Sequence, residues 1–339
     1  MEILSRSQTT PLRFQGIDVS KATFDVAWWG DLPFQEMVNR SFPRSPEGVR
    51  VWLACFTPSE RLGMAAVMES TAGYCKELAA WILQASPGFH VAIANPHRVK
   101  GYACSLGLRN KTDRVDARML AKFGQERQPG AWAPLSASQE ELRALTRTRT
   151  KLKATRTAYR NRLKSKTGGF PVDRKCQEDL VRYLDRQIQV LEKGIRDLGR
   201  RDPALGRDLK LLVSIKGVGL ITAASVLGAA GDLRRFTRRG ELCAFLGVAP
   251  RQFQSGTSVH GKTHMCRTGG KHVRAVLYMA AVATCRTKGP LGDYYRRLVA
   301  AGKLPKSALG ALMRKLLVVM RAVLIQGKPY QAIAPDIAA

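Results

Sequence analysis

Short apolar runs in the first hundred residues predict β-strands that alternate with amphipathic helices. The first three runs follow one another closely and read as an antiparallel meander, whereas the later two follow helical patterns. The expected strands are 14–20, 23–29, 37–42, 64–70 and 90–95, and the expected helices between them are 46–56 and 71–84. A meander that feeds β-α-β units predicts a mixed five-stranded sheet covered by helices, which is the element order of ribonuclease-H-like (RuvC-like) folds.

In the middle of the chain, the apolar residues recur only with the period of a helix. A basic stretch, 136–166, and a second helical run, 176–199, lie on either side of Gly168-Gly-Phe-Pro171. Two helices around such a break predict an antiparallel coiled-coil hairpin. A packed seam is supported by apolar residues at coiled-coil spacing, namely Leu180, Leu184, Ile188, Leu191 and Ile195.

The last third of the chain predicts a mostly helical domain. Lys216-Gly-Val-Gly219 lies between two helical patterns and resembles a helix-hairpin-helix, whose backbone N–H groups hold a DNA phosphate. The alternative is a tight turn between packed helices. Further helices are expected at 240–247, 270–287, 291–301 and 305–326, with an exposed loop at 249–260. The chain is therefore expected to be α/β plus α, with a RuvC-like domain at 1–130, a basic coiled-coil hairpin at 131–205 and a C-terminal domain at 206–339.

The charge indicates the class of partner. The formal net charge is +30 and the sequence pI is about 10.5, an excess that favours a polyanion such as DNA or RNA. The alternative is a protein that is basic without a nucleic-acid partner. The candidate nucleic-acid contacts are Lys111, Arg114, Lys216, Gly217, Gly219, Arg251, Lys262, Arg267, Lys271 and Arg274.

The cysteines and the apolar runs bear on the compartment. Seven scattered cysteines without a C-x-x-C pair predict reduced thiols in a cytoplasmic compartment. A structural zinc is not expected, because His260, His264 and Cys266 lack the further ligand pairs of a closed tetrahedral site. We expect no membrane partner, because no signal peptide is evident and no run approaches the ~20 apolar residues of a membrane span.

Four acids make the first candidate site. Asp113 and Asp116 are three residues apart on a predicted helix that Thr112 would cap, so both carboxylates share one face. Asp18 and Glu69 each lie at the end of a strand-like run. Four carboxylates gathered by a sheet would hold two Mg²⁺ ions and form a phosphodiester-cleaving centre.

Two alternatives to this site stay open. An arbitrary D-x-x-D pair is most often solvated surface. Asp25, on the strand next to Asp18, is a rival ligand, unless strand alternation turns it away.

A serine loop makes the second candidate site. Gln254-Ser-Gly-Thr-Ser258 lies among Arg251, Lys262 and Arg267. Ser255 could attack a phosphate whose developing charge these cations neutralise, and Ser258 is a second candidate. The alternative is an ordinary Ser-Gly turn, and no Ser-His-Asp triad is evident.

Motifs along residues 14–287 resemble one family in content and order. They are Gly16-Ile-Asp-Val-Ser-Lys21, Glu69-Ser-Thr-Ala-Gly73, Asn95-Pro96, Lys111-Thr-Asp-Arg-Val-Asp-Ala117, Ile215-Lys-Gly-Val-Gly219, Phe245-Leu-Gly-Val-Ala-Pro250, Gln254-Ser-Gly256 and Gly270-Lys-His-Val-Arg274. These are similar to the insertion-sequence transposases of the IS-one-ten type, RuvC-like DEDD enzymes related to the Piv-type DNA invertases. One departure is Arg267-Thr-Gly-Gly270, where the family often has Lys-x-Gly-Asn.

The resemblance implies a mechanism and partners. Asp18, Glu69, Asp113 and Asp116 would bind Mg²⁺, and Ser255 would form a covalent phosphoserine link to DNA. A structured bridge RNA would select donor and target DNA in the prokaryotic cytoplasm. Different protomers of a homo-oligomer, a dimer that becomes a tetramer when active, would assemble a composite site.

Two other functions stay open. A RuvC- or DEDD-type metal nuclease would cut by water attack and form no protein–DNA bond. A non-catalytic nucleic-acid-binding protein would keep the fold and would not need the acids.

Overall fold

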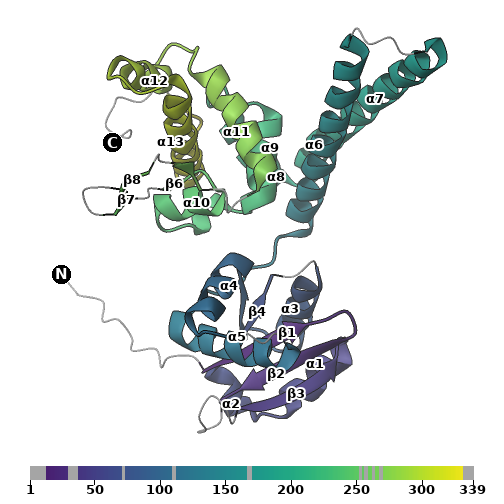
Figure 1. The fold of residues 1–339 in the computed structure, drawn as a ribbon, viewed down its shortest axis with the longest axis vertical. Helices are drawn as coiled ribbons and strands as arrows, with labels where there is room; N and C mark the ends of the chain where they lie inside the picture. Colours follow the sequence, from purple (N-terminus) through teal and green to yellow (C-terminus); the bar gives the residue numbers. More distant parts are fainter. Residues whose placement is uncertain are drawn as a thin grey trace. The chain divides into compact units, whose positions relative to one another are not determined.

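The computed structural model of the chain describes residues 13–29, 37–70, 73–108, 112–165, 170–251, 254–255, 259–261, 264–266 and 270–330. It forms two compact units, Met1–Pro134 and Leu135–Ala339 (Figure 1). The boundary lies close to the predicted start of the hairpin at residue 131. The predicted helical hairpin belongs to the same compact unit as the helices that follow it. The finer three-domain division stays a prediction.

A five-stranded mixed sheet is the centre of the first unit. Its strand order is β3-β2-β1-β4-β5. β1 pairs antiparallel with β2, which pairs antiparallel with β3, whereas β1, β4 and β5 are parallel. The strands are β1 (Arg13–Val19), β2 (Thr23–Trp28), β3 (Val38–Pro43), β4 (Met64–Glu69) and β5 (His90–Ala94). The predicted mixed sheet is thus confirmed, and its arrangement is consistent with a ribonuclease-H-like domain.

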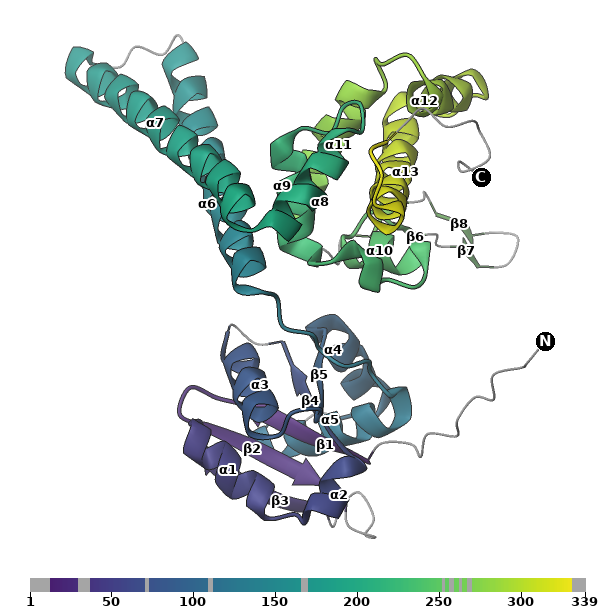
Figure 2. The ribbon, with the colours of Figure 1, turned by 180° about the vertical axis from the view of Figure 1, so that it is seen from behind.

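Helices cover both faces of this sheet, because β1 has side chains to bury on each face. On one face, Ile17 shares a core with Trp52 of α1, and the Trp52 indole donates to Gln15 Oε1 at 3.0 Å. On the other face, Phe14 shares a core with Leu120 of α5. Figure 1 shows α5 lying across the sheet, and Figure 2 shows α1 and α3 from the opposite side. The helices of this unit are α1 (Pro46–Ala54), α2 (Pro58–Leu62), α3 (Tyr74–Ala85), α4 (Pro96–Ser105) and α5 (Asp113–Arg127).

The contact between α5 and β1 is unusually close at Gly16. A Cβ atom added to Gly16 would lie 1.9 Å from Ala117 O and 2.3 Å from Ala121 N. One helical turn farther along, a Cβ at Gly124 would lie 2.5 Å from Phe14 Cβ. Glycine inside a strand commonly marks such a close backbone approach. These two glycines therefore fix how α5 lies against β1.

The second unit begins with a helical hairpin, α6 (Ala137–Lys164) and α7 (Pro171–Arg201). The predicted seam is present, since Leu184, Ile188 and Ile195 are all buried. Ion pairs join the helices along their length, with Arg149 donating to Glu192 at 2.7 Å and Arg160 donating to Asp185 at 2.7 Å. Arg149 precedes Arg160 along α6, whereas its partner Glu192 follows Asp185 along α7. The two helices therefore run antiparallel.

Helix α13 (Pro305–Gln326) packs against α8 (Pro203–Val213), α10 (Arg239–Phe245), α11 (Lys271–Thr284) and α12 (Pro290–Ala300). Helix α9 (Leu220–Ala230), by contrast, packs against α6, α8 and α11. The α13 residues Leu312, Leu316 and Met320 are fully buried in the largest core of the protein. The base of α6 joins this core through Leu142, which is also fully buried. A 3-10 turn lies at Leu233–Arg235.

The loop predicted at 249–260 contains short strands. β6 (Pro250–Arg251) pairs with β9 (His264–Met265), and β7 (Gln254–Ser255) pairs with β8 (Val259–His260). Strands of two residues are too short for alternation to be visible in a sequence. The short helix α2 and the 3-10 turn Leu233–Arg235 were not predicted, and the other described elements follow the predicted order. Within the described ranges, every helix is too short or too polar to cross a membrane.

Candidate active site

Two of the predicted acids lie at the carboxyl ends of neighbouring parallel strands. β1 and β4 pair with Ile17 opposite Met68, so Asp18 and Glu69 occupy the next position on each strand. Glu69 is the last residue of β4, and both acids are partly buried. The carboxyl ends of parallel strands in an open sheet are where ligands usually bind. Adjacent strands therefore place these two carboxylates at one edge.

The other two predicted acids occupy the first turn of α5. Thr112 caps this helix as predicted, its hydroxyl accepting from the Val115 N–H at 3.3 Å. Alternate residues of β1 face α5, since Phe14 and Gly16 both contact it. Asp18 continues this alternation, and α5 runs antiparallel to β1, so the start of α5 lies at Asp18.

The pKa of Asp18 records this convergence. The pKa of Asp18 is raised from 3.8 to about 6, first by burial and then by the nearby carboxylates of Asp116 and Asp113, against a lowering hydrogen bond from the Val19 N–H. Like charges disfavour ionisation of a neighbour only when they are close. Asp18, Asp113 and Asp116 are therefore one electrostatic cluster, formed by a strand and a helix almost a hundred residues apart in sequence.

Asp25 belongs on the same side of the sheet. It pairs directly with Asp18 across β1 and β2, and directly paired residues of antiparallel strands point to one face. Burial raises the pKa of Asp25 and the Asp113 carboxylate raises it further, whereas Ser41 and Arg114 lower it. The register thus decides a question that the sequence left open. Asp25 does not turn away from Asp18.

The raised pKa of Asp18 predicts a pH-dependent stability of the metal-free protein. The folded carboxyl binds its proton more tightly than the unfolded one, so this group lowers stability as pH rises from its ordinary value of 3.8 to about 6. We expect Asp18→Asn to raise the melting temperature in chelator at neutral pH and to have little effect near about pH 4. Thermal unfolding of both proteins across this range tests it. An equal difference at both pH values would contradict it.

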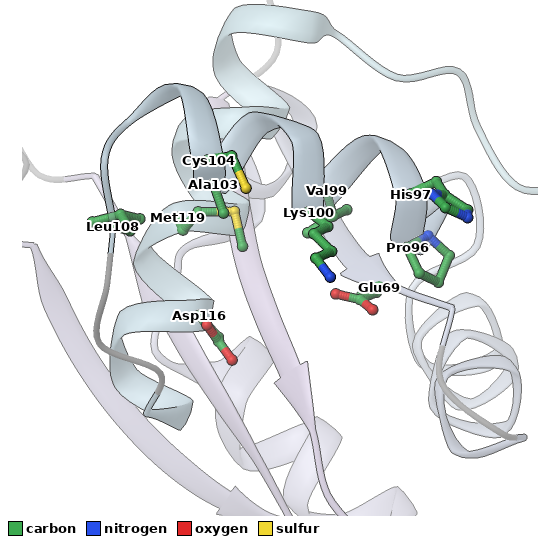
Figure 3. A pocket seen from close by; sticks show the side chains of 10 residues that line it. All are labelled: Glu69, Pro96, His97, Val99, Lys100, Ala103, Cys104, Leu108, Asp116 and Met119. Carbon is green, nitrogen blue, oxygen red and sulfur yellow. The ribbon is translucent and has the colours of Figure 1, made fainter.

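A pocket of about 490 Å³ is lined by one acid of each pair. Glu69 and Asp116 both line it, together with residues of α4 and α5. Figure 3 shows these two carboxylates on different sides of the pocket and the Lys100 side chain pointing toward Glu69. The cluster around Asp18 is therefore open to a ligand at this side.

The donor chemistry fits a divalent metal. Carboxylate oxygens are the ligands that Mg²⁺ prefers, and the mutual repulsion that raises the pKa of Asp18 is relieved by a cation. Within the described ranges, no three acidic, histidine or cysteine side chains already converge as a finished metal site.

The predicted serine site lies in the second compact unit, apart in sequence from the acids. Ser255 ends β7 and pairs with Val259 of β8. Arg251 is exposed on β6, and Lys271 is exposed at the start of α11. Arg274 is partly buried, and Arg114 in the first unit is exposed. Lys111, Ser258, Lys262 and Arg267 lie outside the described residues.

The Lys216–Gly219 turn joins α8 to α9, and its two glycines differ. Gly217 has φ +93°, and a Cβ there would lie 2.1 Å from Thr284 Oγ1, so this glycine is needed for packing against α11. Thr284 also donates to Lys216 O at 3.1 Å. By contrast, Gly219 is exposed at the start of α9, with open space around its Cβ position. The side of the turn that carries Gly219 is therefore accessible to a phosphate.

Comparison with known proteins places these features in a family. The family model described as "Transposase IS116/IS110/IS902 family" matches residues 209–296, and a model of the IS110 DEDD transposases, described as "Transposase", matches residues 15–167. The pilin gene-inverting protein of Moraxella bovis is 31% identical over 319 residues, which cover 93% of this chain and 96% of the relative. The chain belongs to the IS110-type transposase family. The transposase for insertion sequence element IS1111A of Coxiella burnetii is 26% identical over 280 residues, which cover 74% and 72% of the two chains.

Membership makes this IS110-type transposase a DNA transposase or site-specific recombinase. Its DEDD domain indicates use of a divalent metal, in agreement with the donor chemistry at Asp18. The match to the DEDD model spans the sheet, the acids and the first arm of the hairpin. The sequence pattern left Asp25 open as a rival ligand and assigned no role to Gly16. A glycine inside a strand is the signal that could have indicated the close approach of α5.

Proposed function

We propose that this protein cleaves and exchanges DNA strands of an insertion sequence in an Mg²⁺-dependent reaction with a serine nucleophile. The observation that carries the proposal is the close approach of β1 and α5 at Gly16, which places Asp18 at the first turn of α5 with Asp113 and Asp116, in agreement with the raised pKa of Asp18. These three acids, with Glu69, would hold two Mg²⁺ ions. When bound, the metal would supply charge neutralisation and orientation at the scissile phosphate. Asp25 faces the same side as Asp18 and supports the cluster from β2.

The nucleophile we propose is Ser255. Its oxygen forms the new ester bond to phosphorus as the bond between phosphorus and the sugar oxygen breaks. The serine proton is lost, and the leaving sugar oxygen takes up a proton. The phosphoserine link conserves the energy of the DNA ester, so a second strand can be joined without a further energy source. Because Ser255 and the acids belong to different compact units, the proposal includes a homo-oligomer, a dimer or tetramer, in which protomers complement one another.

Nucleic-acid contacts follow from the charge of +30. We propose that the basic coiled-coil hairpin and the C-terminal domain bind the backbones of DNA and of a structured bridge RNA, while base pairing supplies sequence selection. The exposed Lys216 and the Gly219 N–H at the start of α9 would hold a phosphate in the manner of a helix-hairpin-helix. DNA strand cleavage and exchange would then take place at the nucleoid of a prokaryotic cell. Sequencing of the RNA that co-purifies from cells carrying the intact element tests the RNA partner. Recovery of no element-derived RNA would contradict it.

The experiment that tests the nucleophile is Ser255→Ala. We expect this variant to form no covalent protein–DNA adduct, because its side chain has no oxygen to join to phosphorus, and we expect Ser258→Ala to keep the adduct. Denaturing gels of end-labelled DNA incubated with protein, RNA and Mg²⁺ measure it. Retention of the adduct in Ser255→Ala together with its loss in Ser258→Ala would move the nucleophile to Ser258. Cleavage without any adduct in the unchanged protein would favour a water-using nuclease.

A further inference from the structure

We propose that the pocket between α4 and α5 is a nucleobase subsite, which receives the base of a nucleotide next to the scissile phosphate. The inference deepens the proposed function and depends on it, because the acids at the pocket are those proposed to act on the phosphate. It assigns a substrate contact to α4, a helix that supplies none of the four acids.

The lining of the pocket suits a base better than a phosphate. Val99 of α4 and Met119 of α5 form buried apolar wall, and Ala103 and Leu108 extend it. A flat, uncharged base gains from contact with such a surface. A phosphate deep in the same space would lie against the apolar side chains of Val99 and Met119, whereas the metal-bound phosphate of the proposed function would lie at the carboxylates of Glu69 and Asp116.

The position of the pocket places the bound base next to the scissile phosphate. Glu69 and Asp116 form part of its lining and also belong to the acids proposed to act on the scissile phosphate. A phosphate bound at these acids therefore leaves its own nucleoside at the opening of the pocket. The volume of about 490 Å³ is within the usual range of small-molecule sites, so a nucleoside unit can enter.

A cation completes the subsite. Lys100 of α4 is exposed and lines the pocket, and its side chain points toward Glu69 (Figure 3). An ammonium group there offsets the negative charge of the rim and can contact the phosphate that follows the bound base. α4 thus presents apolar side chains to the base and a positive charge to the backbone, and pockets that hold an extruded base likewise enclose it between apolar or aromatic side chains.

Cys104 gives a direct probe of occupancy. Its thiol is free and exposed, and the residue lines the pocket. Cys55 is also free and exposed, lies in the same compact unit, and is absent from the pocket, so it is the matched control. The full-length protein, with the RNA that co-purifies with it, is treated with N-ethylmaleimide in Ca²⁺, with and without element-end DNA, and alkylation of each cysteine is followed by mass spectrometry.

We expect bound DNA to slow alkylation of Cys104 about tenfold and that of Cys55 less than about twofold, since a base in the pocket covers only the first thiol. Equal slowing of both thiols, or no slowing at Cys104 by DNA that binds, would overturn the proposal. Binding itself is measured in parallel by gel shift, so that an unprotected Cys104 is not mistaken for unbound DNA.

A second measurement removes the base. DNA that lacks one base, on the 5′ or the 3′ side of the cleaved phosphate, is compared with intact DNA before and after alkylation. On one side only, we expect base removal to weaken DNA binding about tenfold with untreated protein and less than about twofold with protein alkylated at Cys104. In Cys104→Ser protein, treatment with N-ethylmaleimide should not change the loss of binding that base removal causes. The subsite proposal is wrong if, on both the 5′ and the 3′ side of the phosphate, base removal weakens DNA binding equally before and after alkylation.

The failures of the two proposals are distinguishable. Only the subsite is wrong if Asp116→Asn and Ser255→Ala abolish cleavage but alkylation of Cys104 does not change the effect of base removal on DNA binding. If Asp116→Asn cleaves normally, the proposed function is wrong, and the protection of Cys104 then reports a DNA contact with no part in the reaction.

Discussion

Asp116→Asn is expected to lower the rate of DNA strand cleavage on the order of 10³-fold, equivalent to a barrier about 4 kcal/mol higher. The substitution keeps the shape of the side chain and removes the charge that would hold Mg²⁺ between α5 and the end of β1. Asp18→Asn, Asp113→Asn and Glu69→Gln should have effects in the same direction. Single-turnover cleavage of element-end DNA at saturating protein measures them.

Loss of folding would not explain this result. The Asp116 carboxylate raises the pKa of Asp18, so its removal relieves repulsion there, and thermal unfolding of metal-free Asp116→Asn tests directly that the variant stays folded. The control is Glu47→Gln, because Glu47 is an exposed acid in the first turn of α1 that pairs with Arg50. It should cleave at the normal rate. Normal cleavage by Asp116→Asn would contradict a metal site built on these acids.

Gly16→Ala is expected to destabilise the first unit strongly. The new methyl group would lie 1.9 Å from Ala117 O and 2.3 Å from Ala121 N, and both are backbone atoms that cannot rotate away. Separating α5 from β1 should lower the free energy of unfolding by about 3 kcal/mol. It should also move the first turn of α5 away from Asp18 and weaken Mg²⁺ binding. Urea unfolding and titration calorimetry with Mg²⁺ measure the two effects.

Gly101→Ala is the matched control for this change. Gly101 lies in α4 with nothing within 4 Å of its Cβ position, so alanine should leave the free energy of unfolding equal or up to about 1 kcal/mol higher. If Gly16→Ala were as stable as Gly101→Ala and bound Mg²⁺ normally, the close approach of α5 would not be what positions Asp113 and Asp116.

Most elements of the fold were predictable because their signals are local. Thr112 caps α5 through its own hydroxyl, and Leu184, Ile188 and Ile195 repeat at the spacing of one helix face. The two-residue strands around Ser255 were not predictable, since they have no period. The start of α7 at Pro171 lies five residues before the predicted 176, because proline is well tolerated in the first turn of a helix.

The convergence of the acids was predictable in part. Strand ends and the D-x-x-D spacing indicated that Asp18, Glu69, Asp113 and Asp116 could meet, and a resemblance in motif order indicated which acids to choose. The side of the sheet on which Asp25 lies depends on the register between β1 and β2. A shift of one residue would reverse it, and the sequence does not state that register.

The sequence by itself determined the elements, the excess of positive charge and the family, because periodicity, composition and motif order are properties of the chain in one dimension. The tertiary structure decided which carboxylates act on one another, that Gly16 admits α5 against β1, and that Gly217 faces Thr284 while Gly219 faces outward. These depend on the distance between backbones that are far apart in sequence, and packing in three dimensions alone sets such distances.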